Sequence, residues 1–503
     1  MGRRCRDKSQ CELVDIYREG TLRSVNPVYF FMKARKSGIQ IWSYLSCGDP
    51  RRQAHVRKLL LVCSTLILLL FSACSTGSPP SNVANLKETI VEPSTGTQEL
   101  QTDDREPVMQ EGNLDGRFDA WTLWVDGPHL RGANIYQRRV YLELDGPEFM
   151  GDGSVGPPYR QQDFDTLALL GANYVNISHP GLFSENPPYI LDSVIQENLD
   201  RLLAMIAEAD MFAVIAFRTG PGRSEFTFHL EEVGDWFDDG YLNDQVWEDP
   251  SAQQAWIEMW RYTAQRYQDN PIVVGYELMV EPNANEVYFD EWDPEVYHQD
   301  FGGTIYDWNQ LFPKITSAVR EVDSETPILV GGMGYSAVEW LPYLEPSSDP
   351  RTVYIVHQYA PYEYTHQESY DGSFYPGILD TDYDGRDDEF YTKWLEALLS
   401  PIGVYKEEHG APVAVTEYGL VRWAPGGQEF IQDSIRIFED LGLNHAVWQW
   451  EVSWESYAEE VHVFNYRLGD DPSNREFIAS TALLSVLHDS WRLNQVRPSS
   501  IGP

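Results

Sequence analysis

The sequence predicts an α/β fold, a single (β/α)₈ barrel of the TIM type that is preceded by a signal peptide and a disordered linker. Three features of the 503-residue chain lead to this prediction. An apolar run ends at Cys74, a polar stretch follows it, and the remaining residues alternate short β-type runs with segments of helical periodicity. We expect a signal peptide region over residues 1–73, a linker over 74–116 and the barrel over 117–495.

The first segment has the layout of an export signal. Basic residues between positions 51 and 58 precede an apolar run over residues 59–73. This run is shorter than the roughly 20 residues that span a bilayer permanently. Residues 1–50 are mixed in character and lie ahead of the basic residues, so they do not fit a signal peptide. We therefore expect translation to start later, near Met32 or Val56, and residues 1–50 to be absent from the exported protein.

The apolar run ends in a short cysteine motif. Phe71-Ser72-Ala73-Cys74 resembles the lipoprotein box of bacteria, in which the cysteine thiol receives a lipid. The resemblance implies that Cys74 is the lipidated mature N-terminus and that the protein is an exported cell-envelope lipoprotein; secretion without a lipid is the alternative. All five cysteines lie at or before Cys74, which excludes disulfides and a Cys-ligated metal from the main domain.

The composition of residues 75–116 predicts an unfolded linker, and the net charge limits the classes of binding partner. Residues 75–116 are rich in Ser, Thr, Pro, Glu and Gln and cannot bury enough apolar surface to fold. The chain carries 78 Asp and Glu against 37 Lys and Arg, a net charge of −41. Such a protein repels nucleic acid and anionic lipid headgroups. We therefore expect a monomer that binds no nucleic acid and contacts the membrane only through its lipid anchor. The negative charge is also explained if it only keeps an extracellular protein soluble.

Eight short apolar runs and the helical segments between them predict the barrel. Helical segments show apolar residues at spacings of three and four, as in residues 195–206, 252–260, 430–438 and 477–487. Asp249-Pro250 is a helix start signal. Alternating strands and helices favour a parallel sheet, and eight strands close it. The predicted strands cover residues 130–136, 173–178, 212–217, 272–281, 328–331, 353–359, 413–417 and 446–450.

Two glutamates stand at the ends of predicted strands. Glu281 closes the run that begins at residue 272, and Glu417 closes residues 413–417. Active sites of such barrels lie at the carboxyl ends of the strands. Two carboxyl groups about 5–5.5 Å apart allow retaining glycoside hydrolysis, because one attacks the anomeric carbon while the other protonates the leaving oxygen. One acidic residue after a strand is often only a helix cap, but two at these strands predict a catalytic pair.

The motifs at these strand ends resemble those of clan A glycoside hydrolases, and within that clan the family 5 cellulase and mannanase group. The resemblance covers about residues 121–491. It implies a retaining hydrolase of β-1,4-linked glucan or mannan that acts by a two-carboxylate double displacement and needs no cofactor. In this resemblance Glu281 is the acid/base and Glu417 the nucleophile. The motifs that carry it are Leu130-Arg131-Gly132-Ala133-Asn134-Ile135, Glu281-Pro282, His357-Gln358-Tyr359 and Thr416-Glu417-Tyr418-Gly419.

The same resemblance implies the substrate contacts. His357 and Tyr359 match the pair that contacts the substrate and orients the nucleophile, and Arg131 belongs to the first-strand motif. A sugar-stacking tryptophan is expected after the last strand, at Trp448 or Trp450, of which we favour Trp450. The partner is therefore expected to be a polysaccharide or an oligosaccharide.

The chain departs from the family pattern at three strand ends. Val280 stands where the family has an asparagine that binds the sugar 2-OH, and Asn176 replaces an arginine. The third strand ends in Phe217-Arg218-Thr219 instead of the usual histidine. We expect a divergent member in which Arg218 lowers the pKa of the nucleophile, unless it forms only a salt bridge at the rim. Asn176 and Asn283 are further candidates for substrate contacts, with Asn283 taking over the 2-OH.

Other tryptophans fall in the predicted loops. They can stack on the apolar faces of sugar rings, or they can be buried under their own loops. These residues are Trp236, Trp247, Trp292 and Trp423.

A run of alternating aspartates resembles a calcium loop. Asp380, Asp382 and Asp384 are followed by Gly385 at the sixth position, and Asp388 adds a fourth carboxyl group. The closing glutamate is missing, because position twelve is Tyr391. The sequence leaves two interpretations open, a structural calcium site and a solvated acidic turn.

Two other functions compete with the hydrolase. Val280 and Asn176 also fit a carbohydrate-binding lipoprotein that kept the barrel without turnover. A metal-dependent hydrolase fits poorly, because no His-x-His cluster accompanies His179, His229 and His357, and structural roles suit the first two.

Overall fold

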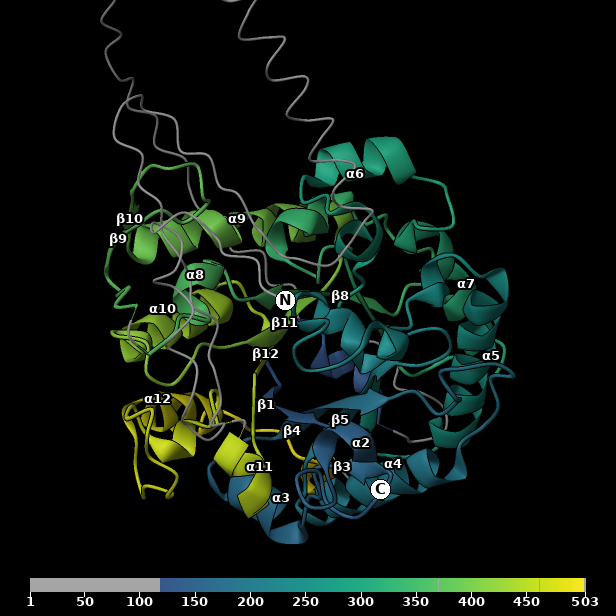
Figure 1. Ribbon diagram of the computed structural model, residues 1–503, viewed down its shortest axis with the longest axis horizontal. Coiled ribbons are helices and arrows are strands. Elements are labelled where there is room, and N and C mark those ends of the chain that lie inside the picture. Colours follow the sequence, from purple (N-terminus) through teal and green to yellow (C-terminus); the bar gives the residue numbers. More distant parts are fainter. Residues whose placement is uncertain (1–117, 370, 461, 502–503) are drawn as a thin grey trace, which may run out of the picture. The chain divides into compact units, whose positions relative to one another are not determined.

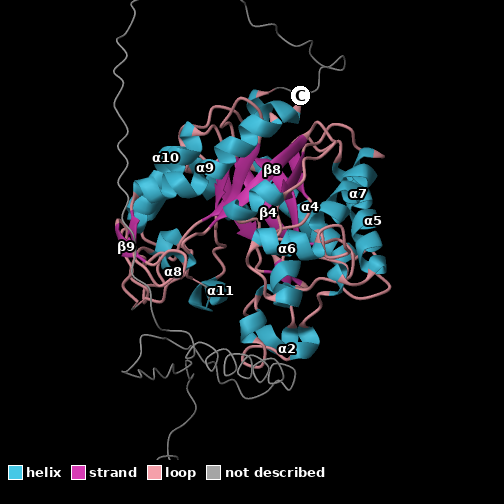
Figure 2. Ribbon diagram, turned by 90° about the horizontal axis from the view of Figure 1, so that it is seen from above, coloured by secondary structure: helices cyan, strands magenta, loops and turns pink. Residues whose placement is uncertain are grey.

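The computed structural model describes residues 118–369, 371–460 and 462–501 (Figure 1). Eight parallel strands close into a barrel in the order β1-β4-β5-β6-β7-β8-β11-β12. In Figure 2 the strands form the centre and helices surround them. The predicted (β/α)₈ fold is thus confirmed, whereas the signal peptide region, Cys74 and the linker lie outside the described residues. The barrel strands are β1 (Arg131–Tyr136), β4 (Tyr174–Pro180), β5 (Phe212–Thr219), β6 (Val273–Glu277), β7 (Ile328–Gly331), β8 (Thr352–Gln358), β11 (Val413–Tyr418) and β12 (Asn444–Val447).

All eight neighbouring pairs in the barrel are parallel. The carboxyl ends of the strands therefore meet at one end of the barrel. The other end is closed by the turn η1 (Ala120–Leu123) and Trp124, whose indole Nε1 donates to the carbonyl of Val274 at 2.8 Å. Of the two ends of the barrel, the carboxyl end is therefore the candidate location of an active site.

Helices cover the outside of the barrel, and their starts follow from capping residues. Asp192 accepts from the amides of Val194 and Ile195 at the start of α4, and Asp249 caps α5 as predicted. The larger helices are α3 (Gln161–Leu169), α4 (Ser193–Glu208), α5 (Pro250–Tyr267), α6 (Pro294–Phe301), α7 (Trp308–Arg320), α9 (Thr392–His409), α10 (Gly427–Asp440) and α12 (Ala482–Trp491). Shorter elements are β2 (Arg138–Arg139), α2 (Leu142–Asp145), β3 (Val155–Gly156), α8 (Tyr362–Thr365), β9 (Gly377–Leu379), β10 (Asp388–Phe390) and α11 (Glu455–Glu460).

Several boundaries differ from the predicted ones, and three of them change where a predicted residue lies. Strand β6 ends at Glu277, so Glu281 lies on the following loop, and β12 ends at Val447, ahead of Trp448. Helix α12 begins at Ala482, where the Thr481 hydroxyl caps it, so Phe477 precedes the helix and is 50% exposed. In the two strands an apolar run continues past the point where backbone pairing stops.

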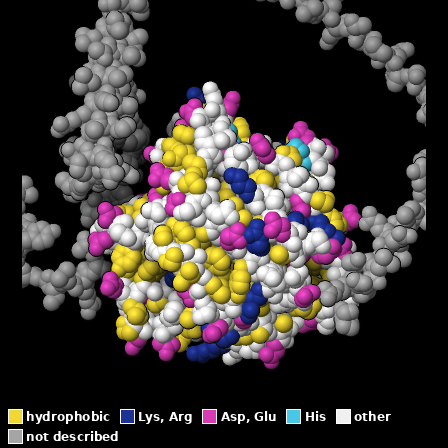
Figure 3. Space-filling view, turned by 90° about the vertical axis from the view of Figure 1, so that its right-hand side faces the viewer, with side chains coloured by type: hydrophobic (Ala, Val, Ile, Leu, Met, Phe, Trp, Pro, Cys, Tyr) yellow, Lys and Arg dark blue, Asp and Glu magenta, His cyan; other side chains and the backbone are white. Residues whose placement is uncertain are grey.

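The surface carries mixed charges. On the face in Figure 3, basic side chains lie among the acidic ones. Within the described ranges no helix is both long and apolar enough to cross a membrane.

Candidate active site

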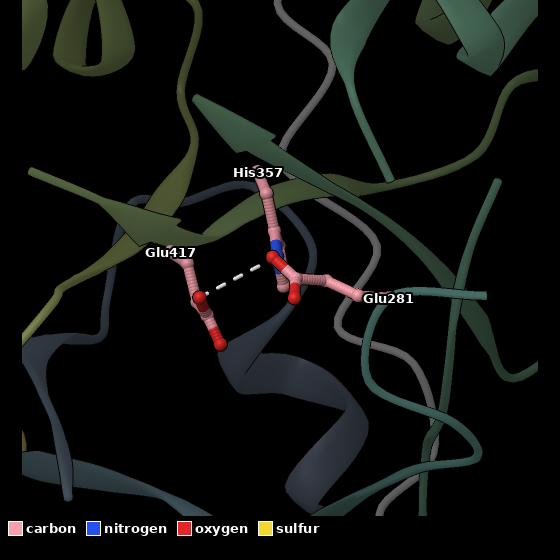
Figure 4. Close-up of side chains that lie close together, drawn as sticks. All are labelled: Glu281, His357 and Glu417. Atoms are coloured by element: carbon pink, nitrogen blue, oxygen red, sulfur yellow. Dashed lines mark hydrogen bonds and ion pairs between the residues drawn. The ribbon is translucent and has the colours of Figure 1, made fainter. Parts of the chain in front are cut away.

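Three side chains meet at the carboxyl end of the barrel (Figure 4). Glu281 comes from the loop after β6, His357 from β8 and Glu417 from β11. His357 Nδ1 lies 3.0 Å from Glu281 Oε1 and 3.5 Å from Glu417 Oε2. A carboxyl oxygen of Glu281 lies within 4.8 Å of one of Glu417. The structure thus brings together the two glutamates and the histidine that the sequence singled out.

The three groups set one another's ionisation. Burial alone would lower the pKa of His357, but the charges of Glu417 and Glu281 raise it to about 9, so the imidazole is cationic at neutral pH. Burial raises the pKa of Glu417 to about 8, against the opposing charge of His357. Burial also acts on Glu281, yet His357 and Arg218 hold its pKa below the ordinary value. Because the carboxyl groups are so close, the ionisation of one depends on the charge of the other.

The loop that carries Glu281 is held by Arg223. This fully buried guanidinium donates to the carbonyls of Val280 at 2.7 Å, Glu281 at 2.5 Å and Arg218 at 3.0 Å. Glu281 has a φ of 54°, in the left-handed region that costs a non-glycine residue about 1 kcal/mol or more. Arg223 offsets this cost and fixes the direction in which the carboxyl group points.

Arg218 ends in the same space, from β5. Its Nη1 lies 3.5 Å from Glu281 Oε2, and its Nε donates to Glu225 Oε1 at 3.0 Å. Burial would raise the pKa of Glu225, but the charge of Arg218 lowers it to about 2. The Tyr136 hydroxyl also donates to Glu225, at 2.7 Å. Arg218 therefore contacts Glu281, the predicted acid/base. Its charge also lowers the pKa of Glu417, the predicted nucleophile, without a direct contact.

A buried polar layer lies beneath the catalytic pair. Glu277 Oε1 is 3.8 Å from His357 Nε2, and Glu277 Oε2 accepts a hydrogen bond from Asn176 at 3.1 Å. Asn176 also donates to Asn134 Oδ1, and Asn134 donates to the carbonyl of Thr416. Asn176, predicted to contact the substrate, is fully buried here and contacts Glu277 instead.

Two aromatic residues flank the pair. The Tyr359 hydroxyl donates to Glu417 Oε2 at 3.0 Å, as expected of a residue that orients this carboxylate. Trp448 packs edge-on against Tyr136, with ring centroids 5.8 Å apart, and lies 5.9 Å from the Arg218 guanidinium. Trp448 is thus the tryptophan after β12 that lies beside the site.

The structure places three other predicted substrate contacts elsewhere. Trp450 is buried, donates to the carbonyl of Asp163 at 2.9 Å and packs on Arg467, so it belongs to the core. Arg131 is the first residue of β1, at the opposite end of the barrel, and pairs with Glu439 at 2.5 Å. Asn283 accepts from Arg223 and donates to the Thr227 carbonyl and the Tyr335 hydroxyl. Asn283 therefore braces the Glu281 loop from within.

The loop tryptophans divide by exposure. Trp247 is buried, and the indole of Trp423 donates to the carbonyl of Gln367. Trp236 packs against Phe226 and His229. Trp292 is exposed. His179 is buried with its ring nitrogens beside Asn198 and the Pro180 carbonyl, a structural environment.

Two groups of ligand-type side chains in the described part of the chain have the spacing for a metal ion. The first is the catalytic cluster itself, Glu281, His357 and Glu417. The second is Asp380, Asp382 and Asp384, whose carboxyl oxygens lie within 4.8 Å of one another. Asp388, the predicted fourth member, starts β10 and accepts from the Thr381 hydroxyl instead.

Several site residues carry no signal in the sequence. Glu277 lies inside an apolar run and Arg223 in a long irregular segment, where no periodicity points to either. Glu225 and Tyr136 are likewise brought to the site only by the closure of the barrel. The positive φ of Glu281 would have signalled a functional loop, but it is visible only in the backbone.

An eight-stranded parallel barrel with two facing glutamates at its carboxyl end defines a glycoside hydrolase. The family model "Cellulase (glycosyl hydrolase family 5)" matches residues 144–453. The chain therefore belongs to glycosyl hydrolase family 5, as a divergent member, and is an enzyme.

Curated relatives and solved structures agree with this assignment. Endoglucanase C of Acetivibrio thermocellus is 22% identical over 336 residues, which cover 60% of this chain and 86% of the relative. Cellodextrinase A of Ruminococcus flavefaciens is 25% identical over 186 residues, covering 37% of this chain and 49% of the relative. The crystal structure of a glycoside hydrolase aligns with a TM-score of 0.51 at 17% identity, over 72% of this chain and 99% of that one, and shows the shared fold.

Proposed function

We propose that this enzyme hydrolyses β-1,4-linked glucan or mannan chains with retention of anomeric configuration, through a double displacement at Glu281 and Glu417. The observation that carries the proposal is the approach of their carboxyl oxygens to within 4.8 Å. Retaining enzymes hold the two groups about 5–5.5 Å apart, whereas inverting enzymes need about 6.5–9.5 Å to admit a water molecule. The endoglucanase relatives support a β-glucan as the substrate.

Each catalytic group has a defined role in the proposed mechanism. Glu417 attacks the anomeric carbon while Glu281 gives its proton to the leaving oxygen, which breaks the glycosidic bond and leaves a glycosyl ester on Glu417. Glu281 then takes a proton from a water molecule that attacks the same carbon, and Glu417 is released. The Tyr359 hydroxyl and the His357 cation orient the two carboxyl groups.

The first step needs a proton on Glu281 and an ionised Glu417. In the ligand-free site the raised pKa of Glu417 and the lowered pKa of Glu281 favour the opposite arrangement. Both groups contact Nδ1 of His357, and they titrate as a unit. A sugar between them brings the leaving oxygen to Glu281, which favours the arrangement with the proton on that residue.

Alanine variants assign the two roles. With an activated aryl β-glycoside, Glu281→Ala and Glu417→Ala should each lose about 10²-fold or more of kcat. Added azide should give a β-glycosyl azide with Glu281→Ala and an α-glycosyl azide with Glu417→Ala, because azide replaces water in the first and the nucleophile in the second. The reverse stereochemistry would exchange the roles.

A control separates catalysis from folding. Glu185 is also buried, but its carboxyl group pairs with Arg139 and Tyr141, so Glu185→Gln should keep the activity. Tight oligosaccharide binding by the wild-type protein without turnover would contradict the hydrolase and favour a carbohydrate-binding lipoprotein.

We also propose that the enzyme works as an exported monomer, anchored through Cys74. The basic residues, apolar run and cysteine motif of the sequence support export. Mass spectrometry of the mature protein should find a lipid on Cys74 and no peptide from residues 1–73.

A further inference from the structure

The end of β5 and the loop after it place two oppositely charged side chains next to Glu281. Arg218, near the end of β5, reaches the Glu281 carboxyl group with Nη1 at 3.5 Å. Glu225 begins the turn η2 (Glu225–Phe228) on the same loop, and its side chain is buried. Because Arg218 contacts both carboxyl groups, its division between them decides how much positive charge acts on Glu281.

Arg218 is bound more closely to Glu225 than to Glu281. Its Nε lies 3.0 Å from Glu225 Oε1 and 3.2 Å from Glu225 Oε2, so one donor is shared between both oxygens. The 3.5 Å contact between Nη1 and Glu281 Oε2 is at the limit of a hydrogen bond. A guanidinium that pairs fully with a carboxylate forms two parallel hydrogen bonds of about 2.7–2.9 Å. Glu281 therefore receives less than a full ion pair.

The Glu225 carboxyl group is held in place and stays ionised. The Tyr136 hydroxyl of β1 donates to Glu225 Oε1 at 2.7 Å, and His229 Nε2 lies 3.7 Å from the same oxygen. Burial would raise the pKa of Glu225, but the charge of Arg218 and the contacts with His229 and Tyr136 lower it to about 2. Glu225 is therefore a fixed negative charge throughout the neutral pH range.

Aromatic rings surround the guanidinium of Arg218. Its Cζ lies 3.6 Å from the centroid of the Phe228 ring, and the rings of Tyr136 and Trp448 lie at 5.8 Å and 5.9 Å. Such contacts between a cation and a ring are stronger where water is excluded, and Arg218 is buried. In the described part of the chain, Glu225 and Glu281 supply the carboxyl groups within ion-pair distance of this cation.

We propose that Glu225 is a positioning residue that keeps Arg218 from forming a full ion pair with Glu281, so that the acid/base can still carry the proton that the leaving oxygen needs. This inference rests on the proposed function, in which Glu281 protonates that oxygen. A full ion pair with Arg218 would stabilise the ionised carboxylate and leave the first step without an acid. The other charged groups that face Glu281 are unchanged in the variants below; they are His357, Arg223, Glu277 and Glu417.

Two substrates that differ in their leaving group separate this role from a structural one. The leaving group of 2,4-dinitrophenyl β-cellobioside departs without a proton, whereas that of phenyl β-cellobioside needs the proton of Glu281. In Glu225→Gln no second carboxylate competes for Arg218. At pH 7 its kcat/KM should therefore fall about tenfold on the phenyl substrate and less than twofold on the dinitrophenyl substrate. A disordered loop would lower both values alike.

A double variant should move the pKa of Glu281 in the opposite direction. Arg218→Gln, Glu225→Gln replaces the buried ion pair by a neutral pair, which leaves no unpaired charge to unfold the loop. Carbon NMR titration, assigned with Glu281→Gln, should show a lower pKa of Glu281 in Glu225→Gln. In the double variant this pKa should lie above the wild-type value, because Arg218 is the nearer of the two lost charges.

A matched control is available at the other end of the barrel. Glu439 pairs with Arg131, and although burial would raise the pKa of Glu439, the contact with Arg131 and that with His445 lower it to about 2. Glu439 thus resembles Glu225 in its partner and its ionisation. Glu439→Gln should leave the ratio of the two activities and the pKa of Glu281 unchanged.

The outcomes distinguish this role from the reaction itself. Equal losses on the two cellobiosides, or a Glu281 pKa that does not fall in Glu225→Gln, would overturn the role of Glu225 and leave the hydrolase intact. If the wild type cleaves neither cellobioside, the proposed function fails. The NMR titrations of the single and double variants then decide alone whether Glu225 keeps Arg218 from Glu281.

Discussion

His357 lies between the carboxyl groups of the site. Its Nδ1 faces Glu281 and Glu417, and its Nε2 faces Glu277 from below, so three carboxyl groups surround one imidazole. The atoms His357 Nε2 and Glu277 Oε1 have no hydrogen-bond partner within the part of the chain that is described, although both are buried. Glu277 is thus a positioning residue that helps to keep the imidazole charged and aligned beneath the reacting groups.

Replacing Glu277 by glutamine should lower the pKa of His357 from about 9 by about one unit or more, because a nearby negative charge is removed. NMR titration of the imidazole carbon measures this shift, and the alkaline limb of the pH–activity profile should change with it. Glu185→Gln serves as the control, because the buried Glu185 carboxyl group pairs with Arg139 and not with His357. A His357 pKa that stays in place would show that Glu277 only fills space.

The residues of the site were predictable to different degrees for physical reasons. Glu281, His357 and Glu417 follow or close long apolar runs, and this one-dimensional pattern survives in the structure. The predicted last strand extends to Trp450, whereas backbone pairing ends at Val447. Trp448 and not Trp450 therefore lies beside the site. Arg131 carries a family motif but stands at the wrong end of its strand. A sequence motif identifies the strand that carries a residue. The exact end of that strand decides whether the side chain reaches the carboxyl end of the barrel.

At the scale of elements, the β9–β10 hairpin holds the predicted calcium loop. Asp380, Asp382 and Asp384 gather at its tip, yet Asp380 and Asp384 already accept backbone amide hydrogen bonds from Gly385 and Arg386. Hairpin register, which the sequence did not predict, places Asp388 in β10 opposite Leu379. Three carboxyl groups are thus left for a cation, and the calcium site remains a prediction.

Calcium should raise the melting temperature if this loop binds it. At about 100 times the dissociation constant, a ligand stabilises a protein by about 2.7 kcal/mol, which corresponds to several degrees in a domain of this size. Thermal melts in calcium and in a chelator measure the difference, and an Asp382→Asn, Asp384→Asn double variant should abolish it. Identical midpoints for the wild type in both conditions would leave a solvated acidic turn.

For the whole molecule, buried acidic groups outside the site bear on stability. Glu451 follows β12, is buried, and has no hydrogen-bond partner for either carboxyl oxygen among the residues described. Burial raises its pKa to about 8, although the charge of Arg467 opposes this. The folded state therefore keeps a proton that the unfolded chain gives up near pH 4.5.

This difference gives stability a pH dependence with a definite sign. The contribution of Glu451 is complete below about pH 4.5, falls as the pH rises towards 8 and is lost above it. Glu451→Gln, which stays neutral, should melt at least about 2 °C higher than the wild type at pH 8 and gain less at pH 5. Calorimetric scans across this range measure the gain, with the exposed Glu476→Gln as the control. If the difference in melting temperature between the wild type and Glu451→Gln stays the same from pH 5 to pH 8, the raised pKa of Glu451 is contradicted.

The amino end of the barrel is closed by residues near the start of the described chain, and this has a practical consequence. The η1 turn and Trp124 close that end, and Val496 and Ile501, near the other terminus, pack on the same cluster of apolar residues. The polypeptide of the barrel thus enters and leaves on the face opposite the catalytic glutamates. A fusion partner or a solid support joined directly ahead of Phe118 or after Ile501 would therefore be attached on the face opposite the catalytic glutamates.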